Sequence, residues 1–101
     1  MNAEIETLAI DYLSRSFLDN YNLTHKNDFE FQKALLKAMI RLSTKSYVNF
    51  DVSYISWSIS KRIRALLIDN KFEVRYCNFV ANNKNIVRLT IGWTYQTLLD
   101  F

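Results

Sequence analysis

The chain has no proline and only one glycine, Gly92, among its 101 residues. Average usage would place about a dozen of these two residue types in a chain of this length. A single glycine excludes the glycine-rich loops that hold phosphate groups. Turns must therefore be formed by other residues, and the ten asparagines are the candidates, because Asn tolerates a left-handed backbone.

Cysteine and histidine are equally scarce, with one of each, Cys77 and His25. A lone cysteine excludes a disulfide within the chain, and a lone histidine excludes a zinc site with two or more histidines. The two could pair as nucleophile and base, but Cys77 falls within a predicted strand and His25 within a predicted loop. We therefore expect no enzyme activity, no catalytic residue, no metal site and no cofactor.

Long apolar runs are also absent, and none approaches the roughly 20 residues that cross a membrane. The first residues, MNAEIETLAIDYL, have no basic segment and carry acids within a helical apolar pattern, unlike a signal peptide. These features predict a cytoplasmic protein with no membrane partner.

Apolar and basic side chains, in contrast, are plentiful. Half of the residues are hydrophobic and 15% are aromatic, which is ample for one core and predicts a single domain over residues 1–101. Residues 1–30 hold six acids and two bases, whereas residues 31–101 hold four acids and eleven bases. The basic part would attract an acidic partner, either a protein or a nucleic acid.

The periodicity of the apolar residues predicts an α+β fold. It indicates helices over residues 3–18, 28–42 and 53–70, a strand over 47–52 and a hairpin over 72–93. These elements predict a three-stranded, mostly antiparallel sheet with the helices packed on one face. The first strand would lie beside the last, in the order 1-3-2; the alternative places it beside the second, through a right-handed crossover. A winged helix is the alternative fold, although the gap of about ten residues before the third helix exceeds the 3–4 residues of a helix-turn-helix.

The hairpin register follows from placing its apolar residues on one face. Its turn would use NNKN, residues 82–85, or the central pair of that segment. The same register sets Phe79 opposite Arg88 and Arg75 opposite Gly92 on the other face. The pairs on the apolar face would be Val80 with Val87, Tyr76 with Ile91, and Val74 with Trp93.

Aromatic and basic side chains recur together on two predicted surfaces, where they could bind a partner. Such mixtures are typical of protein interfaces and also of grooves that bind nucleic acids. The alternative is structural: Tyr54 and Trp57 pack beneath neighbouring segments, and Arg88 stacks on Phe79 as a cation–π pair. The candidate residues are Tyr54, Trp57, Lys61, Arg64 and Ile68 on the third helix and Arg75, Phe79 and Arg88 on the outer face of the hairpin.

The second helix carries a second patch, in which a basic stripe borders apolar residues far from the predicted core face. Two explanations stay open: this helix is sandwiched between the first helix and the rest, or its second side meets a partner. The residues of the patch are Phe29, Lys33, Leu36, Lys37, Ile40 and Arg41.

The succession of helix, short strand, helix and a hairpin that ends on Ile-x-Trp, here IGW at residues 91–93, resembles small uncharacterised α+β accessory proteins of tailed bacteriophages. The resemblance covers residues 28–93 and brings no catalytic residues. It implies a phage accessory protein that acts in the host cytoplasm on a host protein or a host defence.

Together these features predict a small non-enzymatic binding protein, of the inhibitor or anti-defence type, whose partner is a host or phage protein with an acidic surface. A nucleic-acid-binding protein that uses the same basic and aromatic surface is the alternative. A virion or assembly component is the second alternative. Self-association into a homo-oligomer, through the outer face of the hairpin or the second side of the second helix, is compatible with each.

Overall fold

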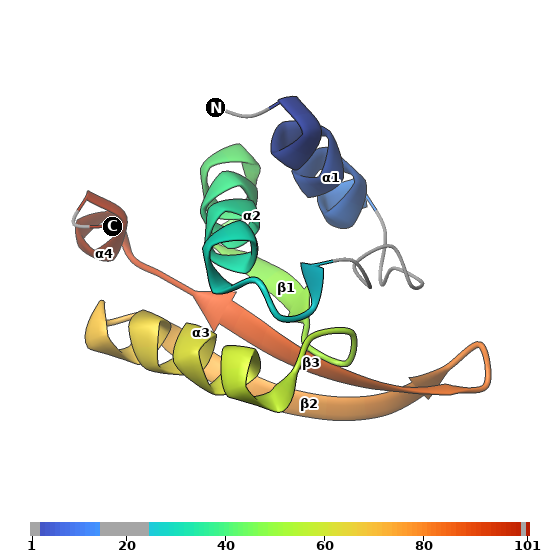
Figure 1. Cartoon of the computed structure of the whole chain (residues 1–101). Coiled ribbons are helices and arrows are strands. Elements are labelled where there is room, and N and C mark those ends of the chain that lie inside the picture. The colour runs from blue at the N-terminus through green and yellow to red at the C-terminus, as the bar shows by residue number, and fades with distance from the viewer. Residues whose placement is uncertain (1–2, 15–24, 100) are drawn as a thin grey trace.

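The structure is a computed structural model that describes residues 3–14, 25–99 and 101. Its three strands form an antiparallel sheet against which the helices pack, so the predicted α+β class is confirmed (Figure 1). The elements follow in the predicted order, and the hairpin is followed by one short helix. They are α1 (Ala3–Ser14), α2 (Phe29–Leu42), β1 (Tyr47–Asp51), α3 (Trp57–Asp69), β2 (Glu73–Ala81), β3 (Lys84–Gly92) and α4 (Tyr95–Leu99).

Helix α1 packs along α2 through a narrow apolar face. Ile5, Ala9 and Tyr12 follow one another at spacings of four and three residues, and all three are buried. This spacing places them on one side of a helix. The predicted continuation of the helix to Leu18, with Phe17 on its apolar face, lies outside the described residues.

Helix α2 begins where the sequence predicts, because Asp28 caps it. The Asp28 carboxylate accepts a hydrogen bond from the backbone N–H of Phe31 at 3.0 Å, which satisfies a donor that the helix itself leaves unpaired. The helix is buried on two sides, since α1 contacts one side and α3 and β1 contact the other. The second apolar side of α2 is therefore part of the core and not a free surface.

Helix α3 begins at Trp57, four residues later than predicted. The Ser53 hydroxyl, at the predicted start of the helix, accepts a hydrogen bond from the backbone N–H of Val87 in β3. Ser56 occupies the N-cap, and its own N–H donates to the carbonyl of Lys26 at 2.8 Å. Residues 53–56 are therefore held by β3 and by the segment before α2, which are contacts that local spacing cannot predict.

The far end of α3 agrees with the prediction. Asn70 is the C-cap, and its side chain donates to the carbonyl of Leu66 at 2.7 Å. Lys71 follows with a positive φ of 68°, the left-handed conformation that commonly terminates a helix. The chain then turns back into β2.

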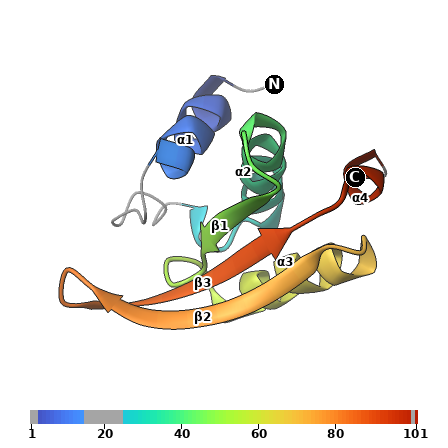
Figure 2. The ribbon, with the colours of Figure 1, turned by 180° about the vertical axis from the view of Figure 1, so that it is seen from behind.

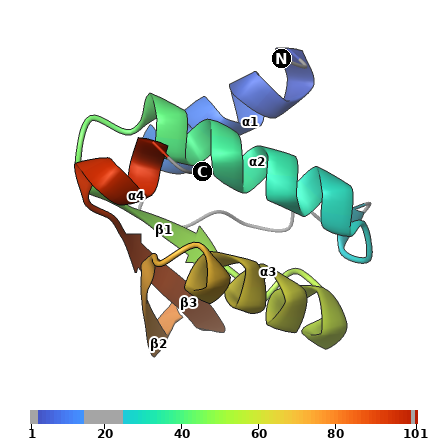
Figure 3. The same ribbon diagram turned by 90° about the vertical axis from the view of Figure 1, so that its left-hand side faces the viewer.

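The sheet has the strand order β1-β3-β2, with both pairs antiparallel, as the sequence predicts. This order excludes the crossover alternative, and β1 occupies the segment where a winged helix would need a tight turn. Figure 3 shows α2 and α3 beside each other on one side of the sheet. Because β3 lies between β1 and β2, β2 is an edge strand.

The hairpin register differs from the prediction by two residues. The turn is Asn82–Asn83, both with positive φ (50° and 62°), so Ala81 pairs with Lys84. A two-residue turn of this kind needs a left-handed backbone at both positions, and two asparagines meet that need better than Asn83 with Lys84. A shift of two residues leaves every side chain on its predicted face. Arg75, however, lies opposite Thr90 rather than Gly92.

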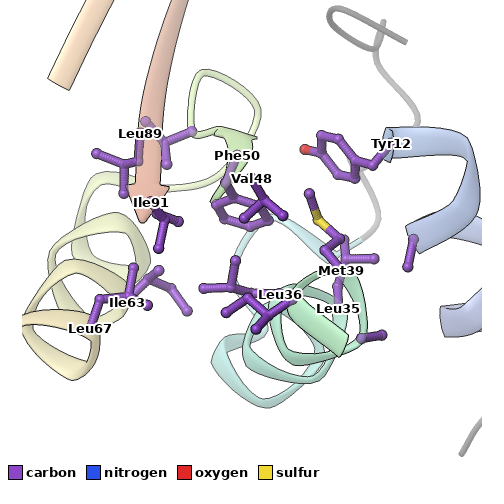
Figure 4. Packing of buried hydrophobic residues seen from close by; sticks show 14 of the residues in the cluster. Tyr12, Leu35, Leu36, Met39, Val48, Phe50, Ile63, Leu67, Leu89 and Ile91 are labelled. Atoms are coloured by element: carbon purple, nitrogen blue, oxygen red, sulfur yellow. The ribbon is translucent and has the colours of Figure 1, made fainter. Parts of the chain in front are cut away.

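The core lies between the sheet and the two helices that cover it. Figure 4 shows side chains of β1 and β3 directed toward α2 and α3, with Tyr12 of α1 against Phe50. The labelled residues of this core are Val48, Phe50, Leu89 and Ile91 from the sheet, Leu35, Leu36 and Met39 from α2, and Ile63 and Leu67 from α3. Both Figure 1 and the view from behind in Figure 2 show that the turn end of the hairpin projects beyond α3.

Candidate functional site

One flank of α3 is open to solvent over its whole length. Trp57, Lys61, Arg64 and Ile68 recur at spacings of four, three and four residues, and all four side chains are exposed. Trp57 is 70% exposed and Ile68 is 51% exposed, which is unusual for apolar side chains of this size. The structural alternative, in which Trp57 packs beneath a neighbouring segment, is therefore wrong for the described residues.

This flank faces away from α2 and toward β2. The guanidinium of Arg62 lies 3.8 Å from the centre of the Phe29 ring, which fixes the side of α3 that looks at α2. Arg64 projects about 160° around the helix from Arg62, because each residue advances about 100°. Trp57 and Tyr76 of β2 line the same shallow groove. The other residues that line it are Val52, Ser53, Ile55, Ser60 and Val87.

Two residues of β2 extend this flank although the sequence places them in the core. Tyr76 and Val80 lie on the helix-covered face, as predicted, but they are 56% and 69% exposed. A nine-residue strand is about 30 Å long and a 13-residue helix about 20 Å, so α3 cannot cover the whole of β2. A helix over the predicted residues 53–70 would be about 27 Å long, close to the length of β2, so no signal in the sequence predicted this exposure.

These residues form one surface, which we call the α3–β2 surface. It combines two exposed aromatic rings, two exposed aliphatic side chains and two cations. Its members are Trp57, Lys61, Arg64 and Ile68 from α3 and Tyr76 and Val80 from β2.

Tyr54 does not belong to the α3–β2 surface. It precedes the first residue of α3, in the connection after β1, and its side chain is half-buried. Its predicted place on the helix face depended on a helix that starts at Ser53, and the tertiary contacts of Ser53 remove that start.

Arg88 and Phe79 are also engaged within the chain. The Arg88 Nε lies 2.9 Å from Oδ1 of Asp51, and the side chains of this ion pair are only 12% and 1% exposed. The guanidinium also lies 4.7 Å from the centre of the Phe79 ring, so the cation–π alternative is confirmed. Because Asp51 and Arg88 are cross-strand neighbours in β1 and β3, the outer face is held together by its own residues.

Arg75 stays exposed but lies on the other face of the sheet from Trp57. Its Nε is 3.0 Å from Oε1 of Glu73, in a pair whose side chains are both well exposed. Exposed pairs of this kind contribute little to stability. The structure therefore does not bring Arg75 together with the candidate residues of α3.

The second patch, on α2, separates into core and surface. Leu36 and Ile40 are buried, so their assignment to a partner-binding patch is corrected: they belong to the hydrophobic core. Phe29 is half-buried beneath Arg62. Lys33 contacts Glu30 at 3.4 Å, Lys37 lies 4.9 Å from the centre of the Phe101 ring, and Arg41 is exposed.

The chemically reactive residues form no site in the described part of the chain. His25 stacks on the ring of Phe31 with centroids 3.7 Å apart, close to Asp28, while Cys77 is exposed in β2. Within residues 3–14, 25–99 and 101, no group of three or more potential metal ligands occurs. In that same part of the chain, no helix has the length and apolarity required to cross a bilayer.

Tyr12 is a buried side chain whose pKa is clearly shifted. Burial in the core raises the pKa of Tyr12 well above its ordinary value, and the negative charge of Asp51 adds to the effect. The hydroxyl donates a long hydrogen bond of 3.5 Å to the backbone carbonyl of Asp51. Tyr12 is thus a core residue whose hydroxyl stays protonated.

Comparison of the chain with protein-family models, with curated proteins and with solved structures finds no match. The α3–β2 surface is the strongest candidate, because it places the exposed Trp57 and Tyr76 rings together with the exposed Lys61 and Arg64.

Proposed function

We propose that this protein is a non-enzymatic binding protein that docks on another protein through the α3–β2 surface. The observation that carries the proposal is the exposure of Trp57, 70% accessible at the start of α3 with Tyr76 next to it. A soluble domain rarely leaves a tryptophan and a tyrosine together in water unless a partner covers them.

The residue types of this surface are those that dominate binding energy at protein interfaces. Trp, Tyr and Arg are enriched among residues whose truncation costs 2 kcal/mol or more, because they bury a large area at a small loss of conformational freedom. Trp57 and Tyr76 supply the apolar centre, and Arg64 supplies a planar cation beside it. Ile68 extends the apolar strip along the helix.

The charges define the partner's chemistry. Neither Lys61 nor Arg64 forms an ion pair with any residue that the structure describes, and both side chains are exposed. A partner that presents carboxylates around an apolar pocket would pair with both cations while it receives Trp57. The resemblance to phage accessory proteins would make that partner a host protein and the consequence its inhibition.

The distribution of the other cations favours a protein over a nucleic acid. Lys33 and Lys37 of α2 are engaged with side chains of the chain, and Arg62 and Arg88 lie over aromatic rings. Binding of a nucleic acid depends on a continuous track of cations along the phosphates. Two free cations beside Trp57 suit a compact acidic patch better than an extended backbone.

The test is affinity capture with a charge-reversed site. The immobilised wild-type protein and the double variant Trp57→Glu/Arg64→Glu are incubated with bacterial lysate, and bound proteins are quantified by mass spectrometry. We expect a specific partner on the wild-type protein and a loss of about 30-fold or more in its affinity for the variant, measured by titration with the purified partner.

The matched control is Tyr95→Glu/Arg41→Glu, which changes an exposed aromatic residue and an exposed arginine away from the site. This control should bind like the wild type, and circular dichroism should show that both double variants are folded. Full binding by Trp57→Glu/Arg64→Glu would mean that α3 is not the docking surface.

A further inference from the structure

Strand β2 presents a long free edge. It pairs with β3 along one side over all nine residues, and among the described residues no strand lies along its other side. The residues that flank a two-residue turn form a hydrogen-bonded pair, and such pairs then alternate along the hairpin. Because Ala81 and Lys84 flank the turn, the N–H and C=O groups of Val74, Tyr76, Asn78 and Val80 point away from the sheet.

Apart from two charged residues at one end, β2 itself carries little of the usual protection of an edge strand. Natural edge strands avoid pairing with other chains through lysine, proline, a bulge or a very short length. β2 contains no lysine and no proline, and its register with β3 runs without interruption. Its two charged residues, Glu73 and Arg75, neutralise each other at one end.

We propose that the β2 edge pairs antiparallel with β2 of a second copy of this chain and joins two sheets into one of six strands. The register that pairs all nine residues places Cys77 opposite Cys77 of the second copy and Glu73 opposite Ala81. In this register the outward-pointing backbone groups of the two strands meet, and Cys77 occupies a pair that shares no hydrogen bond.

The strand is complementary to itself in this register. No two like charges lie opposite each other, since Arg75 faces Phe79 of the second copy on the outer face. On the helix-covered face, the exposed Val80 faces Val74, and Tyr76 faces Asn78. The two Tyr76 rings and the Val80 side chains are diagonal neighbours, at a distance that aromatic side chains can bridge. Pairing would therefore cover Tyr76 and Val80, the exposed large hydrophobic residues of β2.

The size of the contact predicts a weak, reversible dimer. A stable interface of standard size uses about 20–30 residues of each partner, whereas β2 offers nine, with Trp57 of α3 at the border. Each copy carries a net charge of +3, so the two copies repel at long range. Added salt screens this repulsion and should strengthen the dimer.

Sedimentation equilibrium of the protein alone tests the proposal, at about 5 to 500 µM protein and at about 50 and 500 mM NaCl. We expect the 12.0 kDa mass to approach twice that value as concentration rises, at lower concentration in high salt. Val80→Lys, which places a cation on the exposed edge, should weaken dimerisation by about tenfold or more. Thr44→Lys, at an exposed position in the connection between α2 and β1, should leave dimerisation unchanged.

Cys77 provides an independent measurement of the register. In a pair without hydrogen bonds the two Cα atoms lie about 4.5 Å apart, within the range that a disulfide spans. Diamide should then join two Cys77 thiols, as it accepts their two protons and two electrons while the S–S bond forms. The variant Cys77→Ser/Thr44→Cys moves the only thiol of the chain to the connection between α2 and β1. This variant should cross-link far less.

A monomer at every concentration and salt, or a dimer that Val80→Lys leaves intact, would overturn the proposal. A dimer that is sensitive to Val80→Lys but does not cross-link through Cys77 would overturn the register. The proposed binding of a protein partner is judged separately, because these experiments contain no partner and leave Lys61, Arg64 and Ile68 unchanged.

Discussion

At the scale of single residues, the Asp51–Arg88 ion pair holds the outer face of the sheet together. A buried carboxylate needs a cation and hydrogen bonds, since an isolated buried charge is strongly unfavourable. Arg88 meets that need for Asp51 at 2.9 Å, and its stacking on Phe79 adds a contribution of about 0.5–1 kcal/mol. Removal of either partner of such a pair typically costs about 3–5 kcal/mol, so both residues are required by the fold.

Tyr12 leads to a prediction about alkaline stability. Because burial raises the pKa of Tyr12 in the folded chain, the unfolded chain loses this proton first, at about pH 10. Stability from the protonated hydroxyl is thus fully present below about pH 10 and is lost above it, by up to about 1.4 kcal/mol per pH unit. Urea unfolding between about pH 8 and 11 should show this slope, and Tyr12→Phe should reduce it.

The control is Tyr95→Phe, because the Tyr95 ring is 76% exposed in the folded chain. Tyr12→Phe should change the dependence of the unfolding free energy on pH more than this substitution does. An equal slope for wild type and Tyr12→Phe would contradict the assigned role of Tyr12.

At the scale of elements, α2 shows how a helix with two apolar sides is used. Leu36 and Ile40 lie on the side that sequence periodicity left open between a sandwich and a binding patch, and the structure buries both. α1 covers one side of α2 and the sheet with α3 covers the other, so both apolar sides are needed inside one chain. The lysines of the same helix remain at the boundary with solvent.

The substitution Leu36→Ala tests this placement. It removes a fully buried side chain and should lower the free energy of unfolding by about 2–5 kcal/mol. Leu99→Ala, at a 60% exposed position in α4, is the control and should have a much smaller effect in the same urea titration. A Leu36→Ala protein with unchanged stability would restore α2 as a candidate binding surface.

At the scale of the whole molecule, the basic side chains are divided among several surfaces. Lys61 and Arg64 lie on α3, Lys37 lies beside Phe101 near α4, and Arg75 lies on the other face of the sheet. The net charge of +3 therefore says little by itself about the chemistry of a binding partner. The position of each cation relative to Trp57 is more informative.

This division predicts weak binding to nucleic acids. In a fluorescence-anisotropy titration with labelled single- and double-stranded DNA and RNA, we expect no micromolar binding at either about 50 or 200 mM salt. Micromolar binding at the lower salt that falls steeply at the higher salt would contradict the proposed function. It would favour the nucleic-acid alternative, with Lys61 and Arg64 as phosphate contacts.

The sequence by itself determined the elements and the faces of their side chains. The positions of most helices and strands, the N-cap of α2 at Asp28 and the hairpin faces follow from local periodicity, capping and the parity of strands. These features depend on residues close together in the chain. They could therefore be predicted without the tertiary structure.

The tertiary structure decided which of those faces is covered. It moved the start of α3 to Trp57 through contacts of Ser53 with β3, paired Arg88 with Asp51, and left Tyr76 and Val80 exposed. Burial depends on which segments, distant in the chain, lie over a residue, and periodicity contains no information about that. The α3–β2 surface exists because the hairpin is longer than the helix that packs on it.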